Sequence, residues 1–330
     1  MDLTTKYLGL KLKNPIVPSA SPLSTSVDTV KEMEDKGASA VVMYSLFEEQ
    51  IEHEANAVDS FLMQGTDSFA EALSYFPQPE EFHNKDAEEY LEQIRALKSA
   101  VSIPVIGSLN GVSAGGWLDY AKQIEQAGAD ALELNIYFIP TDPSKTSADI
   151  EKMYVDDLKT VKGKVGIPVS VKLSPYFSAT ANMAKQLDDA GADGLVLFNR
   201  FYQPDLDLDE LEVKADLELS RRYDQRLSLR WLAILKPFVK ASLAATSGIH
   251  DAQGVLKSVL VGADVAMIAS TLIQNGVGRI ETILKDMEQW METKEYASIE
   301  QMKGSMSYSA VAEPAAYERA NYMKVLQSIK

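Results

Sequence analysis

Polar residues stand at the ends of five predicted strands, and together they indicate one binding site. A polar side chain in a buried strand gives up its hydration, so it needs a partner or a function. One such strand end is usually a local capping detail, but five in one chain indicate a bound polar ring system. The residues are Asn110 after VIGSL, Asn135 after LEL, Lys172 after VSV, Asn199 after VLF, and Ser247 and Gly248 after LAAT.

Lys172 lies in mid-strand between Val171 and Leu173, where an ammonium group is costly to bury. One interpretation is structural, namely an internal salt bridge. A second is functional, namely a cation that stabilises negative charge developing on a bound ring. A third is covalent, namely a Schiff base with a carbonyl substrate, as in aldolase-type barrels. The surrounding pattern of polar strand ends favours the second.

Two segments of small residues follow the seventh and eighth predicted strands, and they predict a phosphate site. In α/β barrels these two loops often hold a phosphate through backbone N–H groups and a helix N-terminus. Each segment alone is a weak motif, but both occur after the expected strands. The segments are Thr246-Ser247-Gly248-Ile249 and Ala269-Ser270-Thr271.

The composition excludes several other kinds of site. The chain has no cysteine, which excludes disulfides, thiolate nucleophiles, iron–sulfur clusters and cysteine-type zinc sites. Its three histidines, His53, His83 and His250, are far apart in the sequence, so we expect no metal site. The net charge of -16 repels nucleic-acid phosphates and anionic lipids. We therefore expect a small-molecule substrate and neither a nucleic acid nor a membrane as partner.

The N-terminal sequence MDLTTKYLGLKLKNPIV lacks the basic segment and long apolar segment of a signal peptide. No stretch reaches the roughly 18 apolar residues that a membrane helix needs. We therefore expect a cytoplasmic protein, and a homodimer is one assembly open to it.

A recurring unit positions the polar strand ends: a helix ends in Gly-Ala and a short apolar run follows. Glycine suits the left-handed position after a helix. The apolar runs are typical of strands buried on both faces of a parallel sheet. The unit appears as KGASAVVMYS from Lys36, QAGADALELN from Gln126, DAGADGLVLFN from Asp189 and VGADVAMIAS from Val261.

Eight predicted strands alternate with eight predicted helices, which indicates an α/β protein with a closed (β/α)8 TIM barrel. A doubly wound open sheet is the alternative. The strands are predicted at 14–20, 40–45, 103–109, 131–136, 168–173, 194–199, 241–246 and 265–269. The helices are predicted at 27–36, 86–100, 115–127, 148–163, 179–190, 228–239, 251–260 and 276–293.

Two insertions and a tail complete a single predicted domain over 1–330. Residues 46–85, after strand 2, are rich in aromatic residues, which favours a lid or a subunit contact over surface elaboration. Residues 200–227, after strand 6, are rich in Asp, Glu and Arg. The tail begins at about 295, and its sequence YERANYMKVLQSI predicts a helix that packs on the barrel or on another subunit.

By their order and spacing, several motifs resemble the dihydroorotate dehydrogenase family of FMN barrels. The resemblance covers roughly 1–290, and no single motif is specific. The absence of an N-terminal membrane-associated extension makes the chain similar to the soluble class 1 branch. The motifs are NPIVPSAS, LELN with Asn135, VKLSP with Lys172, FN with Asn199, TSGI and IASTL.

The resemblance implies FMN as the cofactor and a role for each matching residue. Lys172 would touch the N1/O2 edge of the flavin, and Asn199 would face the substrate. Asn110 and Asn135 would bracket flavin and substrate. The implied cofactor-binding residues are Ala20, Ser21, Ser45, Asn110, Asn135, Lys172, Ser247, Gly248, Ala269 and Ser270, the last four at the phosphate.

The substrate half of the site departs from the family pattern. Phe138 stands where the family has its catalytic base, and Pro140 stands where it has a second asparagine. Tyr44 stands where it has a lysine after strand 2. Because phenylalanine cannot accept a proton, we expect a hydroxyl within 137–147 to take this role. The candidates are Tyr137 and Ser144.

We therefore predict an FMN-dependent oxidoreductase that acts on CH–CH groups, similar to dihydroorotate dehydrogenase. Oxidation of dihydroorotate to orotate, a step of pyrimidine biosynthesis, is the first reaction to test. The alternatives are a flavin oxidoreductase on another small cyclic substrate, a catalytically silent barrel that binds FMN or another phosphorylated ligand, and a flavin-free aldolase-type barrel. The predicted catalytic residues are Lys172, Asn135, Asn199, Tyr137 and Ser144.

Overall fold

The computed structural model describes residues 1–50, 87–111, 120–201, 203–214, 217–318 and 322–327. Eight parallel strands form a nearly closed barrel in the order β3-β13-β12-β9-β8-β7-β6-β4. The Ser39 N–H donates to the Ile16 carbonyl at 3.0 Å and connects the two outer strands. The predicted barrel is confirmed, and the open sheet is wrong. The strands are β3 Ile16–Pro18, β4 Val41–Val42, β6 Val105–Gly111, β7 Ala131–Ile136, β8 Val169–Leu173, β9 Gly194–Leu197, β12 Ser242–Ala245 and β13 Val265–Ile268.

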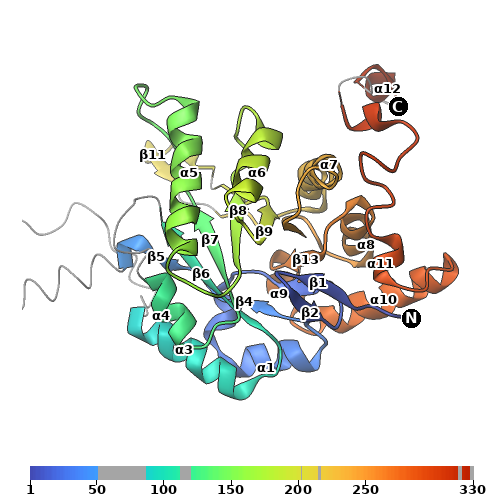
Figure 1. Ribbon diagram of the computed structural model, residues 1–330, viewed down its shortest axis with the longest axis horizontal. Helices are drawn as coiled ribbons and strands as arrows, with labels where there is room; N and C mark the ends of the chain where they lie inside the picture. The colour runs from blue at the N-terminus through green and yellow to red at the C-terminus, as the bar shows by residue number, and fades with distance from the viewer. Residues whose placement is uncertain (51–86, 112–119, 202, 215–216, 319–321, 328–330) are drawn as a thin grey trace, which may run out of the picture.

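Helices surround this barrel, and α5 and α6 lie side by side (Figure 1). The last predicted helix, 276–293, corresponds to α10, and an unpredicted short helix, α9, precedes it across Gly276, which has φ of 79°. The first part of the predicted helix 115–127 lies outside the described residues. The helices are α1 Val27–Asp35, α3 Ala87–Ala100, α4 Tyr120–Gln126, α5 Ser147–Lys162, α6 Thr180–Asp189, α7 Gln225–Leu235, α8 Ala252–Val261, α9 Ser270–Asn275 and α10 Arg279–Thr293.

The recurring Gly-Ala unit connects neighbouring strands at the base of the barrel. Its glycines, Gly37, Gly128, Gly191 and Gly262, all have φ between 95° and 117°. In three units an aspartate follows, and its carboxylate accepts the N–H of a residue near the start of the neighbouring strand. The pairs are Asp130 with Val105 at 2.7 Å, Asp193 with Val169 at 2.7 Å and Asp264 with Leu243 at 2.8 Å. Each aspartate also forms an ion pair, with Lys98, Lys162 and Lys303 respectively.

An antiparallel hairpin that the sequence analysis did not predict closes the same end of the barrel. It consists of β1, Thr5–Tyr7, and β2, Leu10–Leu12. The Leu8 N–H donates to Ser242 Oγ at 3.1 Å, and Thr5 Oγ1 donates to the Asp264 carbonyl at 2.9 Å. Tyr7 and Leu8 pack among the inward-facing residues of the strands. The base is therefore filled, which leaves the carboxyl ends of the strands as the open end.

The insertions and the tail differ in how far the structure describes them. Residues 51–86 lie outside the described residues, so the predicted lid or subunit contact stays a prediction. The short strand β5, Leu46–Phe47, precedes them and pairs with β6. After β9, a hairpin of β10, Asp205–Asp207, and β11, Glu212–Lys214, projects before the 3-10 turn Arg222–Asp224 and α7.

The tail packs on the barrel through residues that precede its predicted helix. The segment around α11, Ile299–Met302, contacts α8, and the Gly304 and Met306 N–H groups donate to carbonyls of that helix. Within the predicted helix the described residues form α12, Tyr322–Gln327, which the 3-10 turn Pro314–Tyr317 precedes in the chain. Figure 1 shows α12 at the outer end of the tail.

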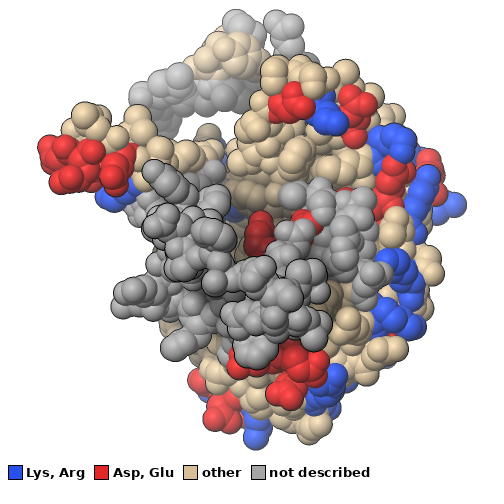
Figure 2. Space-filling view, turned by 90° about the vertical axis from the view of Figure 1, so that its left-hand side faces the viewer, with Lys and Arg blue, Asp and Glu red and all other residues tan. Residues whose placement is uncertain are grey.

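The described surface mixes both signs of charge. On the face in Figure 2, acidic and basic side chains of the described residues are interspersed along the right-hand edge and at the bottom, and a group of acidic side chains lies at the upper left. None of the helices in the described ranges combines the length and apolarity that crossing a bilayer requires.

Candidate active site

Asn110, Asn135 and Lys172 lie side by side on three neighbouring strands near the open end of the barrel. Asn110 of β6 is in register with Asn135 of β7, and Asn135 is in register with Lys172 of β8. Side chains alternate along a strand, and the flanking leucines of β6 and β7 face the outer core, so these three face inward. The exposed fractions of Asn110, Asn135 and Lys172 are 8%, 7% and 7%. The barrel thus presents three adjacent buried polar groups to whatever binds in its mouth.

Lys172 forms a buried ion pair with Glu133, one inward-facing layer below. Its Nζ lies 3.4 Å from Glu133 Oε1, and Glu133 is fully buried. The internal salt bridge that the first interpretation of Lys172 predicted is therefore present. Burial, and then the charge of Glu133, raise the pKa of the neighbouring Tyr7 phenol well above its usual value. The other oxygen, Glu133 Oε2, has no hydrogen-bond partner among the described residues.

Glu133 was missed in the sequence analysis, although a signal for it was present. It stands between Leu132 and Leu134 in a buried strand, which is the same criterion that singled out Lys172. A charged residue flanked by leucines on both sides needs a partner of opposite sign. Only the register of β7 against β8 shows that this partner is Lys172.

Asn199 and Ser45 join the polar row from adjacent segments. Asn199 follows β9, and its Nδ2 donates to Asn135 Oδ1 at 2.5 Å. Ser45 Oγ forms a hydrogen bond of 2.9 Å with a serine hydroxyl of β6. Ala20 and Ser21 follow β3 directly and are half-buried. The polar row and these residues therefore occupy the open ends of six neighbouring segments of the barrel.

The predicted phosphate residues converge on a serine that the sequence analysis missed. The Gly248 N–H donates to Ser220 Oγ at 3.1 Å, and Ser220 Oγ lies 2.8 Å from Ser270 Oγ. A Cβ at position 248 would lie 2.6 Å from the Arg221 carbonyl, so only glycine fits there. Ser247 has φ of 71°, a conformation rare for serine. Ala269 directly precedes Ser270 at the start of α9.

Positively charged or chargeable groups lie next to this cluster of donors. His250 Nε2 is 2.7 Å from the Ser220 carbonyl oxygen. The Arg279 guanidinium donates to the His250 carbonyl from two nitrogens, each at 3.2 Å. His250 directly follows the TSGI motif, so the sequence analysis could have identified it from its position. Ser220 lies in an irregular segment, and no sequence pattern there could have identified it.

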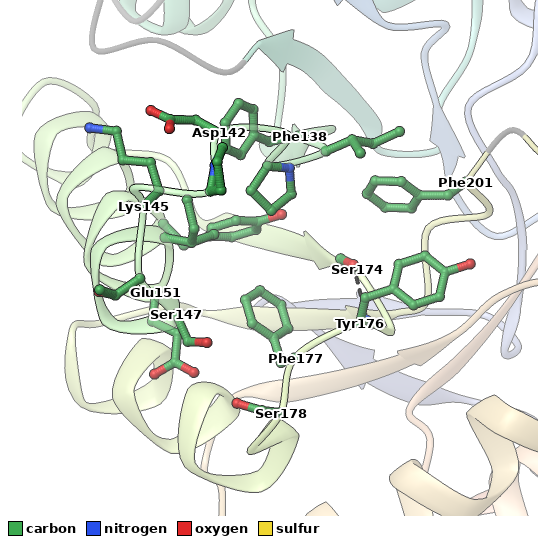
Figure 3. Close-up of a pocket in the computed structure, with 16 residues that line it drawn as sticks. Phe138, Asp142, Lys145, Ser147, Glu151, Ser174, Tyr176, Phe177, Ser178 and Phe201 are labelled. Atoms are coloured by element: carbon green, nitrogen blue, oxygen red, sulfur yellow. Dashed lines mark hydrogen bonds between the residues drawn. The ribbon is translucent and has the colours of Figure 1, made fainter.

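The residues of the expected catalytic loop are not all at the barrel mouth. Tyr137 stacks on Phe201 with ring centroids 4.3 Å apart. Ser144 is exposed, and its hydroxyl donates to Asp142 Oδ1 at 2.7 Å. Phe138 lines a cavity of ≈ 480 Å³ between the segments that follow β7 and β8 (Figure 3). The structure thus brings Lys172, Asn135 and Asn199 together and holds Ser144 on a separate turn.

The donor set fits a cofactor with a polar ring and a phosphate, as expected for FMN. The buried amides and the ammonium of the row match a ring with carbonyl and imide edges. The cluster at Gly248, Ser220 and Ser270 offers N–H and O–H groups that now bond to one another and would turn to a phosphate oxygen. Among the residues described, no three His, Asp or Glu side chains gather as metal ligands.

The amino-acid sequence was compared with those of known proteins and of protein families. Residues 74–291 match the family model for dihydroorotate dehydrogenase. The chain is 25% identical over 307 residues to the dihydroorotate dehydrogenase B (NAD(+)) catalytic subunit of Thermoplasma volcanium, covering 92% of this chain and 98% of that one. It is 25% identical over 328 residues to the same subunit of Bacillus pumilus, covering 95% and 100%. It is 20% identical over 333 residues to the chloroplastic dihydropyrimidine dehydrogenase (NADP(+)) of Arabidopsis thaliana, covering 93% and 78%.

Proposed function

Since this chain belongs to the dihydroorotate dehydrogenase family, we propose that it is an FMN-dependent oxidoreductase acting on a CH–CH bond of a small cyclic substrate. Members of this family are flavin-dependent oxidoreductases. The observation that carries the proposal is the row of Asn110, Asn135 and Lys172 across three strands at the barrel mouth. The whole chain then acts as one FMN-binding barrel domain. A cytoplasmic location and a homodimer remain predictions.

The proposed FMN site consists of the polar row at the barrel mouth and the cluster of donors around Gly248 and Ser270. Lys172, Asn110 and Asn135 would hold the ring, with Ala20, Ser21 and Ser45 beside it. Ser247, Gly248, Ala269 and Ser270 would hold the phosphate, and Ser220 would release its hydrogen bond with Gly248. When bound, FMN supplies a ring that accepts a hydride from carbon.

The chain's own residues contribute charge, orientation and water exclusion. The Lys172 ammonium is positioned to stabilise negative charge on the ring edge, a kind of interaction often worth several kcal/mol in a water-excluded site. Glu133 holds that ammonium from below at 3.4 Å. The Asn135–Asn199 amide pair would orient the substrate. Phe138 excludes water but takes no proton, so Tyr137 and Ser144 remain the proposed hydroxyl candidates for proton transfer.

The choice of substrate turns on two residues of the loop after β7. Dihydroorotate is the first substrate to test because the relatives carry its name. Phe138 and Pro140 remove a proton acceptor and an amide from the family's substrate loop. These replacements favour a second candidate, a flavin oxidoreductase on another small cyclic substrate. Two further candidates perform no flavin turnover, namely a catalytically silent FMN barrel and an aldolase-type barrel.

An absorption spectrum of the purified protein, followed by an anaerobic substrate screen, separates these candidates. A flavin band excludes the aldolase-type barrel, and bleaching of that band by a substrate excludes the silent barrel. Bleaching by a ring compound other than dihydroorotate would support the second candidate. A colourless protein that takes up no added FMN would overturn the proposal.

A further inference from the structure

A cavity of ≈ 480 Å³ is lined by residues of α5 and of the segments that follow β7, β8 and β9. It lies open to solvent between the segment after β7, the first turns of α5 and the segment after β8 (Figure 3). Cavities of roughly 300–1,000 Å³ are typical of small-molecule sites. The size therefore suits a compound of one or two fused rings.

Two segments that carry the proposed active site also line the cavity. Ser174 follows Lys172 by two residues, and Phe201 follows Asn199 by two. Residues two apart in a chain have Cα atoms at most roughly 7 Å apart, so these walls lie close to the polar row. A ring in the cavity would therefore lie next to a ring held by the row.

The inner wall of the cavity is aromatic. Phe201 is stacked on Tyr137, with centroids 4.3 Å apart and 12° between the planes. Tyr176 contacts the same ring edge-on at 5.6 Å and 80°. Phe138 and Phe177 face the cavity from the other segments (Figure 3). Such walls bind flat rings by stacking and edge contacts.

The charges in the lining oppose binding of a carboxylate. Asp142, Glu151 and Lys145 lie on the α5 side of the cavity, away from Phe201 and Tyr176 (Figure 3). Hydrogen bonds from the Ser144 side chain and backbone hold the pKa of Asp142 below its usual value, so it is charged at neutral pH. Two carboxylates against one ammonium leave this end negative.

We propose that this cavity binds the ring of the enzyme's substrate and of its oxidised, flat and conjugated product, and that this ring is uncharged rather than one that carries a carboxylate. That the bound ring is one on which the enzyme acts rests on the proposed function. The chemical class of the ring is inferred from the walls and charges of the cavity alone.

Titration of the full-length chain with coumarin and with orotate, with and without FMN, tests the inference. Coumarin is flat and uncharged, and orotate is flat and anionic. Calorimetry and saturation-transfer NMR should give a dissociation constant at least tenfold lower for coumarin. Tyr176→Ala should weaken coumarin binding roughly two- to tenfold, the range of a lost aromatic contact. Tyr176 is 66% exposed, so this variant should fold.

Matched variants make the result specific to the cavity. Tyr176→Phe should retain binding, and Phe201→Ala should weaken it at least as much as Tyr176→Ala. Phe238→Ala should change nothing, because Phe238 is exposed and packs against Tyr308 elsewhere. Tighter binding of orotate, or coumarin binding that neither Tyr176→Ala nor Phe201→Ala weakens, would overturn the inference.

These experiments distinguish a failure of the cavity inference from a failure of the proposed function. Coumarin binding that depends on Tyr176 in a protein that takes up no FMN would support the cavity and overturn the proposed function. FMN uptake without coumarin binding would support the proposed function and overturn the cavity.

Discussion

Lys172 and Glu133 form an ion pair inside the barrel, so neither side chain can be changed without affecting the other. Removing one partner of a buried pair leaves an uncompensated charge, which costs more than the pair itself contributes. This coupling means that a loss of activity in a Lys172 variant has two sources, one at the proposed flavin and one in the protein's stability.

We predict that Lys172→Ala lowers the free energy of unfolding by about 3–5 kcal/mol, because it leaves Glu133 buried without a cation. It should also slow reduction of bound flavin by roughly 10²–10³-fold. Urea denaturation and stopped-flow absorbance measure the two effects. The double variant Lys172→Met with Glu133→Gln should recover most of the stability but not the reduction rate. Equal stability of the single and double variants would show that the pair is not the cause.

The replacement of the family's base by Phe138 predicts slow or absent oxidation of dihydroorotate. A positioned base contributes roughly 10²–10⁴-fold to such a reaction. Any residual turnover should fall further in Tyr137→Phe or Ser144→Ala. Steady-state assays with dihydroorotate measure it. Turnover on the order of 10 per second that survives both substitutions would show that another group takes the proton.

At the scale of elements, α5 carries a buried acid that opposes folding at neutral pH. Asp157 is 2% exposed, and its Oδ2 has no hydrogen-bond partner among the described residues. Burial, and then the charges of Asp156 and Glu48, raise its pKa from 3.8 to about 7. The unfolded chain therefore releases this proton at lower pH than the folded protein does. The stability cost begins near pH 4, grows as the pH rises and is complete above about pH 7.

We predict that Asp157→Asn raises the melting temperature by a few degrees, and by more at pH 8 than at pH 5. A gain of 1 kcal/mol corresponds to roughly 1–2 °C for a domain of this length. Calorimetry at both pH values measures the shift. Asp189→Asn is the control, because Asp189 is exposed and forms an ion pair with Lys185 on the neighbouring helix α6. An equal gain at the two pH values would contradict the assignment of the charge to Asp157.

The elements of the barrel were predictable because their signals are local. Each Gly-Ala unit marks a helix end and a strand start, and the structure has a left-handed glycine at each one. The inward row of Asn110, Asn135 and Lys172 was predictable as strand ends, because parallel strands all carry their carboxyl ends to one side. The hairpin at the base was missed because its two strands are only three residues each.

Parts of the site that depend on contacts between distant segments were not predictable. Glu133 becomes the partner of Lys172 only through strand register. Ser220 reaches Gly248 and Ser270 from an irregular segment with no periodic pattern. The cavity wall is likewise assembled from segments far apart in the sequence, such as Tyr137 and Phe201.

For the whole molecule, we predict that FMN stabilises the fold and that metal chelation leaves its stability unchanged. A ligand at 100 times its dissociation constant adds about 2.7 kcal/mol to the free energy of unfolding. Riboflavin should raise the melting temperature less than FMN, because it lacks the phosphate that Gly248 and Ser270 are proposed to hold. Differential scanning fluorimetry with FMN, riboflavin and EDTA measures this. An equal shift by riboflavin would contradict the phosphate site, and a decrease with EDTA would reveal a bound metal.

The bridge between Asp2 and Ser298 determines where an affinity tag or fusion partner would emerge. Asp2 is hydrogen-bonded to Ala297 and Ile299, and nearby Thr5 bonds to Asp264 at the filled base. A linker at the N-terminus therefore leaves the barrel from the end opposite the proposed substrate cavity. Immobilisation on a sensor chip or an electrode through this terminus would leave the mouth facing solution, whereas attachment through lysines near the mouth, such as Lys145, would turn some molecules toward the support.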